Sequence, residues 1–521
     1  MTIFEETRVH GAGGGGGKGG GGGGGSAPTE DPNTLQSKST ARLIDLLGEG
    51  EIGGLVDGAK SIHFNDTPLL SSDGGENFKG VTWEQRTGLP DQAHVPGFPA
   101  TETEIGVNAE VLASQPVTRT VTDPSVDAVR VTVSVNALTS QDTSTGDLHG
   151  ARVEIAIDVR SNGGAWTTTV SDAIDGKTVS TYERAYRVDL DGNGPWDIRV
   201  RRITPDSDKA TLQNKTYFSR YAEIIDGKFT YPDSALVAIT IDAQQFGGQI
   251  PTRSYDVKGL LIRVPSNYDP ETRGYTGLWD GTFKRAWTDN PAWVFYDILT
   301  NERYGLGDAI AATQVDKWSL YGIARYCDGM VPSGRKDGSG KPILEPRYTF
   351  NGAITGREEA YRVVQGIASV FRGMAFWSAG SVFARADMPS DPVKLVTPAN
   401  VVGGDFTYNG TALKARHSVA LVQWNDPEDG YKTAIEVVED HGAIAQWGWR
   451  PVEITAFGCC RRSQARRMGL WVLDSERHET ETVTYSASFD HADLTPGDLI
   501  AIADPSYANA RFGGRLAGYG E

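Results

Sequence analysis

The sequence predicts an α+β protein that is mainly β and consists of several domains. Its length of 521 residues is enough for roughly three to five domains of ordinary size. Apolar and polar residues alternate through much of residues 118–250, which indicates β-strands with one buried face. Between residues 289 and 372 the apolar residues follow helical spacing after helix start signals, which predicts a small helical region.

Residues 1–36 are predicted to form a Gly-rich flexible arm. Thirteen of the fifteen residues from Gly11 to Gly25 are glycine, and such a run has a high entropic cost of ordering and no side chains to bury. A phosphate-binding loop would need a Lys-Ser/Thr pair and a strand–loop–helix frame, and the sequence has neither here. In an assembly, an arm of this kind can also enter a crevice too narrow for side chains.

Residues 37–117 are predicted to be the first segment of a domain. Four apolar residues predict a short helix-like segment that ends at Gly48: Leu43, Ile44, Leu46 and Leu47. A strand is expected over residues 61–65, followed by a turn at Asn65-Asp66. Pro and Gly are frequent in residues 89–100, which predicts a loop.

Residues 118–250 are predicted to form a β-sandwich domain inserted into the chain. One of its clearest strand patterns is an alternation of valines with polar residues, at Val129, Val131, Val133 and Val135. Turns such as Asn162-Gly163-Gly164 and Asp175-Gly176 separate segments of this kind. Carbohydrate-binding modules share the sandwich architecture, so the fold alone does not determine the function.

Residues 251–400 are predicted to form a domain with helices. Asp289-Asn290-Pro291 is a helix start, because a capping side chain precedes a proline in the first turn. Thr313 with Asp316 and Thr355 with Glu358 have capping-box spacing, and each pair precedes an apolar helical pattern. Residues 328–347, rich in Gly, Pro and Lys, are expected to form a loop between these helices.

Residues 401–521 are predicted to form a second β domain that is truncated at its C-terminal end. A buried strand is expected over residues 418–424 and a helix over residues 463–475. Alternating apolar residues predict a further strand at Val483, Tyr485, Ala487 and Phe489. The strand-and-turn pattern before Glu521 stops without a clear end, which favours truncation.

The composition limits the classes of partner and the compartment. With 67 acidic and 50 basic residues the net charge is −17, which argues against broad binding of nucleic acid or anionic membranes. Three cysteines, Cys327, Cys459 and Cys460, cannot form a disulfide framework and lack metal-ligand spacing. The first residues lack a signal peptide, and no apolar run approaches the roughly 20 residues of a membrane span. We therefore expect synthesis in the cytoplasm.

No motif in the sequence predicts catalysis, a cofactor or a metal. The eight histidines stand apart from one another and from metal-ligand patterns: His10, His63, His94, His149, His417, His441, His478 and His491. Gly305-Leu306-Gly307 lacks the third glycine and the preceding strand of a dinucleotide site. Carboxylate pairs and aromatic residues are nevertheless frequent, so a glycan-cleaving enzyme and a carbohydrate-binding protein stay open.

One basic strip is a candidate contact surface: Arg461, Arg462, Arg466 and Arg467. These residues fall on the predicted C-terminal helix, opposite its apolar side. One interpretation is a solvated face whose arginines pair with Asp474 or Glu476. The other is functional, as a contact to an acidic neighbouring subunit or as a lining that faces DNA in a channel.

Several long blocks of this sequence carry a family resemblance, and they run in order along nearly the whole chain. The most informative is residues 253–307, which place aromatic residues, Pro, Asn and Gly in turns without any nucleophile. The others are LIDLLGEGEIGGLVDGAKSIHFNDTPL, RRITPDSDKATLQNKTYFSRYAEIID, DKWSLYGIARYCDGMVP, ALKARHSVALVQWNDPEDGYKTAIEVVED and AFGCCRRSQARRMGLWVLDSE. Together they resemble the tail tip attachment proteins of lambda-like long-tailed phages, also called host specificity proteins or central tail hubs.

The resemblance implies a homotrimer at the distal end of a phage tail. In such proteins the N-terminal half forms hub domains like those of contractile-tail baseplate hubs. Two related β domains per chain, in three copies, make a pseudo-six-fold ring that matches the hexameric tail tube. The sandwich of residues 118–250 and the helices of residues 289–372 would elaborate this hub. The family's C-terminal half, with fibronectin-like modules and the receptor-binding tip, is expected to be missing here.

The expected function is therefore that of a structural virion protein with no catalysis. By the resemblance it caps the tail tube, takes part in host attachment, holds the tape-measure protein behind it, and opens for protein and DNA. Its partners would be itself, other tail tip and tail tube proteins, the tape-measure protein and DNA in transit. A host receptor would be reached only through the missing part. The alternatives are a tail-associated enzyme that degrades cell wall or glycan, and a carbohydrate-binding adhesin.

Overall fold

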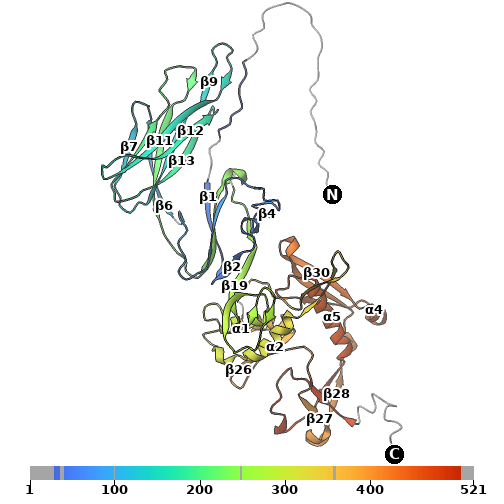
Figure 1. Cartoon of the computed structure of the whole chain (residues 1–521). Helices are drawn as coiled ribbons and strands as arrows, with labels where there is room; N and C mark the ends of the chain where they lie inside the picture. Colours follow the sequence, from blue (N-terminus) through green and yellow to red (C-terminus); the bar gives the residue numbers. More distant parts are fainter. Residues whose placement is uncertain (1–27, 36–39, 99, 247–248, 356–358, 506–521) are drawn as a thin grey trace, which may run out of the picture.

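The computed structural model describes residues 28–35, 40–98, 100–246, 249–355 and 359–505. These residues contain thirty-three strands and five α-helices, so the prediction of a mainly β α+β protein is confirmed. Figure 1 shows a β-sandwich at one end of the molecule and helix α5 (Arg462–His478) with small sheets at the other. The glycine run from Gly11 to Gly25 lies outside the described residues. Within the described ranges, no helix has both the length and the apolar character needed to cross a membrane.

The sandwich consists of two four-stranded antiparallel sheets, in the orders β12-β11-β14-β7 and β13-β8-β16-β6. Its strands are β6 (Ala100–Glu110), β7 (Val117–Val121), β8 (Ala128–Val135), β11 (Ala151–Ser161), β12 (Thr167–Gly176), β13 (Tyr182–Asp189), β14 (Trp196–Arg202) and β16 (Thr216–Asp226). The domain therefore begins at Ala100 and ends at Asp226, whereas the sequence placed it at residues 118–250. The next strand leaves the sandwich because its pairing partner lies in the neighbouring domain.

The sandwich core confirms the alternation that predicted it. Val129, Val131 and Val133 of β8 are fully buried and pack with apolar side chains of the facing sheet. One buried charge interrupts the polar outer face: Asp158, 1% exposed, accepts hydrogen bonds from Arg199 and Arg201. A small sheet, β10-β9-β15, lies beside the sandwich and consists of β9 (Thr139–Gln141), β10 (Leu148–His149) and β15 (Leu212–Gln213).

Three small sheets surround a second core next to the sandwich. They are β1-β17-β5, β18-β3-β4 and β2-β19-β22. Their strands are β1 (Thr40–Glu49), β2 (Ile52–Leu55), β3 (Ile62–Phe64), β4 (Thr67–Pro68), β5 (Thr82–Thr87), β17 (Ser234–Asp242), β18 (Arg253–Tyr255), β19 (Val257–Pro265) and β22 (Phe283–Trp287). Because β5 and β17 pair with each other, the sandwich is an insertion between two neighbouring strands of one sheet.

The predicted helix-like segment at Leu43 to Leu47 was wrong, because these residues lie in strand β1. Leu43 pairs with Ile239 of β17, almost two hundred residues later, and this pairing overrides the local pattern. The predicted strand near residues 61–65 and its turn are confirmed as β3 and a turn in which Asn65 and Asp66 both have positive φ, 47° and 66°.

The helical region contains α1 (Pro291–Thr300), α2 (Lys317–Asp328) and α3 (Ala360–Val370) around one large core. The start signal at Asn290 is confirmed, since its side chain accepts a hydrogen bond from the Ala292 amide. Helix α2 is capped by Asp316 rather than by Thr313. The proposed cap at Thr355 and Glu358 falls partly outside the described residues, and Glu359 is the residue before α3.

The predicted loop over residues 328–347 was wrong, because it contains a hairpin of β23 (Met330–Lys336) and β24 (Pro342–Pro346). A register shift between Pro332 and Lys336 hides the hairpin from a simple alternation test. Further hairpins of this region are β20 (Tyr268–Asp269) with β21 (Gly274–Tyr275), and β25 (Gly373–Ser378) with β26 (Ser381–Ala386).

The last part of the described chain packs helix α5 on a three-stranded sheet. The sheet, in the order β30-β29-β31, comprises β29 (Val419–Asp426), β30 (Lys432–Glu439) and β31 (Pro451–Thr455), with α4 (His441–Trp447) beside it. Gly469 lets α5 approach closely, since a Cβ there would lie 2.8 Å from Val438 and 3.0 Å from Val422. The strand and helix predicted here are confirmed as β29 and α5.

The remaining elements are two small sheets and short 3-10 turns. The sheets pair β27 (Lys394–Val396) with β33 (Ile500–Ile502), and β28 (Thr407–Gly410) with β32 (Glu481–Thr484). The turns are Gly58–Ser61, Ala243–Phe246, Ala312–Gln314, Pro398–Asn400, Val402–Gly404, Leu413–Ala415, Pro427–Asp429 and Phe489–His491. The strand predicted through Phe489 ends at Thr484, and Phe489 is 92% exposed. Residues 506–521, where the sequence suggested truncation, lie outside the described part.

Candidate functional site

The basic strip of α5 is held by two carboxylates from distant strands. Arg461 and Arg467 both contact Glu345 of β24. Arg462 and Arg466 both contact Glu436 of β30, at 2.6 Å and 3.3 Å. The two glutamate side chains are only 12% and 5% exposed. The strip is therefore divided into two pairs of arginines, each sharing one nearly buried carboxylate.

The partners that the sequence suggested for this strip were wrong. Asp474 pairs with His478 at 3.1 Å, and Glu476 pairs with His417 at 2.9 Å. The true partners lie more than twenty residues away along the chain, one of them in the segment expected to be a loop, so no local pattern could reveal them.

The strip leaves excess positive charge on part of the surface. Four guanidinium groups share two carboxylates, so the described residues leave two positive charges of this cluster uncompensated. Arg462 and Arg466 are 68% and 57% exposed, whereas Arg467 is 22% exposed. The outer pair is thus available to a partner, and the inner pair joins α5 to the β23–β24 hairpin.

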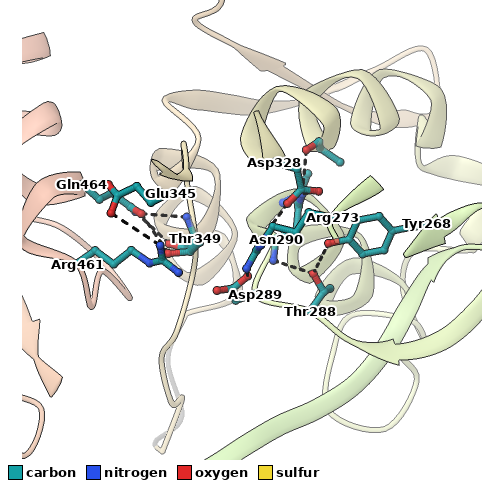
Figure 2. Close-up of polar contacts among 12 residues, drawn as sticks. Tyr268, Arg273, Thr288, Asp289, Asn290, Asp328, Glu345, Thr349, Arg461 and Gln464 are labelled. Carbon is teal, nitrogen blue, oxygen red and sulfur yellow. Dashed lines mark hydrogen bonds and ion pairs between the residues drawn. The ribbon is translucent and has the colours of Figure 1, made fainter. Parts of the chain in front are cut away.

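Polar contacts beside the inner pair strengthen the junction between α5 and the helical region. Figure 2 shows Arg461 next to Glu345 and Gln464 next to Thr349. Gln464 accepts a hydrogen bond from the Thr349 amide at 3.0 Å and donates one to its carbonyl oxygen, also at 3.0 Å. Both residues are buried. Paired amide bonds of this kind set the position of the helix along the neighbouring segment.

A second group of arginines lines an open cleft of about 690 Å³ at the same junction. Arg347 lies over the Tyr326 ring at 4.3 Å, and Arg372 lies over the Trp471 ring at 5.0 Å. Burial lowers the pKa of Arg372. Acidic residues also line the cleft: Glu439, Asp440 and Asp474. The cleft therefore suits an isolated anionic group better than a continuous polyanion.

The stretch of residues 253–307 contains a buried ionic network. Arg273 contacts Asp289 and Asp328, whose side chains are 5% and 2% exposed. Asp328 also accepts hydrogen bonds from Tyr275 at 2.8 Å and from Asn290 at 2.7 Å. Burial raises the pKa of Asp328, and the donors around it oppose that shift. Figure 2 shows Arg273 between the two aspartates.

This network has a structural role. It joins the β20–β21 hairpin, the start of α1 and the end of α2, and aromatic rings surround it. Tyr275 packs against Tyr268 and Tyr321, with ring centroids 4.8 and 5.2 Å apart. The aromatic and Asn residues singled out in the sequence thus specify packing. Among the residues with described positions, no group of three or more His, Cys, Asp or Glu side chains is arranged to hold a metal ion.

Comparisons with known proteins connect this architecture to phage tails. Residues 101–227, which nearly coincide with the sandwich, match the family model described as "Tip attachment protein J, FNIII-A domain". Residues 359–517 match the model described as "Putative phage tail protein". A curated relative, tip attachment protein J of Escherichia phage SECphi27, is 39% identical over 92% of this chain. The chain is similar to the tip attachment proteins J.

A second curated relative gives the same result. Tip attachment protein J of Escherichia phage SECphi4 is 36% identical over 94% of this chain. The alignments cover 39% and 43% of the two relatives, so the chain spans about two fifths of the length of the curated proteins it matches. A solved structure, the virion of a native gene transfer agent particle, contains a chain that covers 76% of this one at 14% identity, with a TM-score of 0.34; the match covers 81% of that chain.

The family match corrects one expectation. The resemblance placed fibronectin-like modules in the part of the family that was expected to be missing, yet an FNIII-A domain lies within this chain at residues 101–227. The sandwich that the alternating valines predicted is therefore this domain.

Proposed function

We propose that this chain is a structural subunit of a phage tail tip and contributes the hub around the tail's central channel. The observation that carries the proposal is the 39% and 36% identity to two tip attachment proteins J over more than nine tenths of the chain. In this role the subunit caps the tail tube, takes part in host attachment and opens for genome ejection. Its place is the virion, at the distal end of the tail.

The proposed assembly is a homotrimer that contacts other tail tip proteins, the tail tube and the tape-measure protein. Three copies of a chain with two hub-like β regions match a six-fold tube. DNA passes through the assembly transiently. Contact with a host receptor belongs to the part of the relatives that this chain does not span.

The carboxylates give no support to an enzyme that cleaves glycans. The most prominent buried pair, Asp289 and Asp328, is occupied by Arg273 and nearly excluded from solvent. A glycan-cleaving pair must flank a bound sugar, with one carboxyl able to exchange a proton with it. The geometry around Arg273 leaves no room for that role.

The sandwich offers limited support for a carbohydrate-binding adhesin. Trp166 is an aromatic residue on its outer face, but the guanidinium groups of Arg160 and Arg199 lie 4.4 Å and 4.1 Å from its ring centroid. Sugar stacking needs an open ring face. The ring of Trp166 instead makes cation–π contacts with these two arginines.

We further propose that the outer pair of the basic strip, Arg462 and Arg466, contacts an acidic surface of a neighbouring subunit. The shared Glu436 leaves this pair with about one net charge, which is little for binding DNA. The acidic residues Asp440 and Asp474 of the adjoining cleft would repel a polyanion. A single carboxylate from a neighbour fits both features.

Two measurements test the proposed function. Light scattering after size-exclusion chromatography should give a mass near three times the chain mass of 56.1 kDa, and images should show rings with a central channel. Antibodies against the sandwich should label phage particles at the distal end of the tail. A monomer at all concentrations would argue against the trimer, and labelling elsewhere on the particle would overturn the tail tip assignment.

A further inference from the structure

Residues 28–35 form an extended segment along one edge of the sandwich, here called the N-terminal strap. The Leu148 amide donates to the Thr29 carbonyl oxygen at 2.9 Å, and the Asp31 amide donates to the Leu148 carbonyl oxygen at 3.0 Å. Farther along, the Thr34 and Leu35 amides both donate to the Lys177 carbonyl oxygen, at 3.0 and 3.2 Å. The strap thus pairs with the edge of β10 in the small β10-β9-β15 sheet and with the residue that follows β12 of the sandwich. These residues fall within the arm predicted at residues 1–36.

A buried charge links the strap to the sandwich. The Lys177 side chain is only 2% exposed, and its ammonium group lies 2.6 Å from Glu30 and 3.4 Å from the side-chain oxygen of Asn33. A buried ammonium group without a partner is costly, because it loses its hydration. An acidic side chain in the strap therefore offsets the loss of hydration that covering Lys177 causes.

Polar groups on either side of Lys177 also match the strap. Asp147 accepts hydrogen bonds from the amide and hydroxyl of Thr29. His149 lies 3.0 Å from the Asp31 carboxylate. In addition, the Thr34 hydroxyl accepts a hydrogen bond from the Lys177 amide at 2.9 Å. Hydroxyl, carboxylate and amide groups of the strap thus each contact a polar group of the residues beside it.

Two glycines let the strap lie close to the sandwich backbone. A Cβ at Gly176 would lie 2.5 Å from the Thr34 hydroxyl and 3.0 Å from Leu35, and one at Gly146 would lie 3.0 Å from Pro28. Leu35 packs against the core of the sandwich. Shape, charge and backbone bonding therefore all correspond to one extended, acidic segment.

The strap also attaches the sandwich at a second place. The chain leaves for the sandwich after Thr87 and returns at Ala235, and these two residues are paired in the β5–β17 register. Thr40, five positions after Leu35, pairs with Asp242 at the other end of β17. Seven residues of strand separate the two ends, a distance of about 23 Å. Figure 1 shows β1 running between the sandwich and the rest of the molecule.

We propose that the edge formed by residues 146–149 and 176–178 is an acceptor groove for an acidic extended strand, and that the strap fills it to clamp the sandwich. One ion pair across this boundary, Arg42 with Glu102, is 3.9 Å long and about one third exposed, so it contributes little. A partner that binds the chain before residue 28 would therefore pull on the sandwich, through the strap, before it pulls on the neighbouring domain. Release of the strap uncovers Lys177 and the edge of β10.

Hydrogen–deuterium exchange of the full chain tests this inference. The strap amides of Asp31, Thr34 and Leu35 should be protected in the native chain. In Lys177→Met the apolar side chain keeps the sandwich core filled, so sandwich protection should persist while strap amides exchange at least tenfold faster. Glu30→Gln should act in the same direction without changing the sandwich. The matched control is Glu110→Gln, which removes an exposed pair with Lys215 at 3.5 Å and should leave the strap unchanged.

A peptide experiment tests the groove itself. In the Glu30→Gln chain, a capped peptide of residues 28–35 at millimolar concentration should restore protection of the Leu148 and Lys177 amides. The same peptide with Gln in place of Glu30 should restore less. The proposal is overturned if the native strap exchanges as fast as a free peptide, or if Lys177→Met and Glu30→Gln both leave its protection unchanged. It is also overturned if the two peptides protect the groove equally or not at all.

Discussion

Replacing Arg273 by Met tests the buried network that joins the β20–β21 hairpin to α1 and α2. The substitution leaves Asp289 and Asp328 in place, 5% and 2% exposed, without their shared cation. Removing one partner of a buried pair costs about 3–5 kcal/mol. Tyr275 and Asn290 still donate hydrogen bonds to Asp328. We therefore expect the lower end of the range, about 3 kcal/mol, for local opening of this region.

Hydrogen exchange at the α1 amides measures this loss locally, which suits a chain with several cores. A cost of about 3 kcal/mol corresponds to exchange more than a hundredfold faster, because each tenfold is about 1.4 kcal/mol. The control is Arg285→Met, which removes a pair with Glu51 that is 3.2 Å long and whose arginine is 55% exposed. That substitution should cost less than about 1 kcal/mol, or about fivefold in rate.

The effect of Arg273→Met should shrink on acidification. Burial raises the pKa of Asp328 above its ordinary value, so the folded chain keeps this proton to a higher pH than the unfolded chain does. Ionised Asp328 therefore costs stability as the pH rises, and removal of Arg273 enlarges that cost. Adding Asp328→Asn should restore much of the protection at pH 7. A change below threefold at pH 7, or one that is equal at pH 4 and pH 7, would refute this reasoning.

Three further predictions concern other parts of the molecule. Although burial raises the pKa of Asp158, hydrogen bonds from two guanidinium groups and a hydroxyl hold this pKa at about 2. The contribution of ionised Asp158 to the stability of the fold should therefore vanish as the pH falls from about 4 to 2. Asp158→Asn should remove that part of the acid unfolding transition, as measured by near-UV circular dichroism. Gly469→Leu should lower the free energy of unfolding, measured by thermal unfolding, by about 1–3 kcal/mol, because it overpacks α5 against its sheet. Gly322→Ala in α2, where a Cβ meets nothing within 4 Å, should raise this free energy by roughly 0.5–1 kcal/mol. Equal effects of the two substitutions would contradict the packing argument. Arg466→Gln should weaken subunit association at least tenfold in sedimentation experiments without changing thermal stability, while Arg335→Gln on the exposed β23 should change neither.

The sequence predicted what local patterns encode and missed what distant pairing decides. The valines of β8 predicted the sandwich because alternation of apolar and polar residues is a short-range signal. Asn290-Pro291 predicted the start of α1 because helix capping is local. Leu43 was assigned to a helix because its strand partner, Ile239, cannot be inferred from neighbours. The limits of the sandwich were displaced for the same reason, since β17 has sandwich-like alternation but pairs with β1.

The candidate site shows the same division between local and distant information. Four arginines close together were visible in the sequence, and the structure places three of them on α5 and Arg461 at its N-cap. Their partners Glu345 and Glu436 were not visible, because a carboxylate in a Gly-rich hairpin or on a strand has no spacing relation to the helix. A long hairpin with a displaced register, rather than composition, brings Glu345 to the strip.

The way the sandwich is attached determines how far it can move relative to the neighbouring domain. Its two chain connections begin at Thr87 and Ala235, which are direct neighbours in the sheet. The outgoing connection packs along β17 as far as Ala238 through Val95 and Phe98. A further attachment beyond it, where Thr40 pairs with Asp242, adds resistance to rotation of the sandwich. The strap supplies this further attachment, and its strength depends in part on the pairing of Lys177 with Glu30. Motion of the sandwich relative to the neighbouring domain would therefore require release of the strap first.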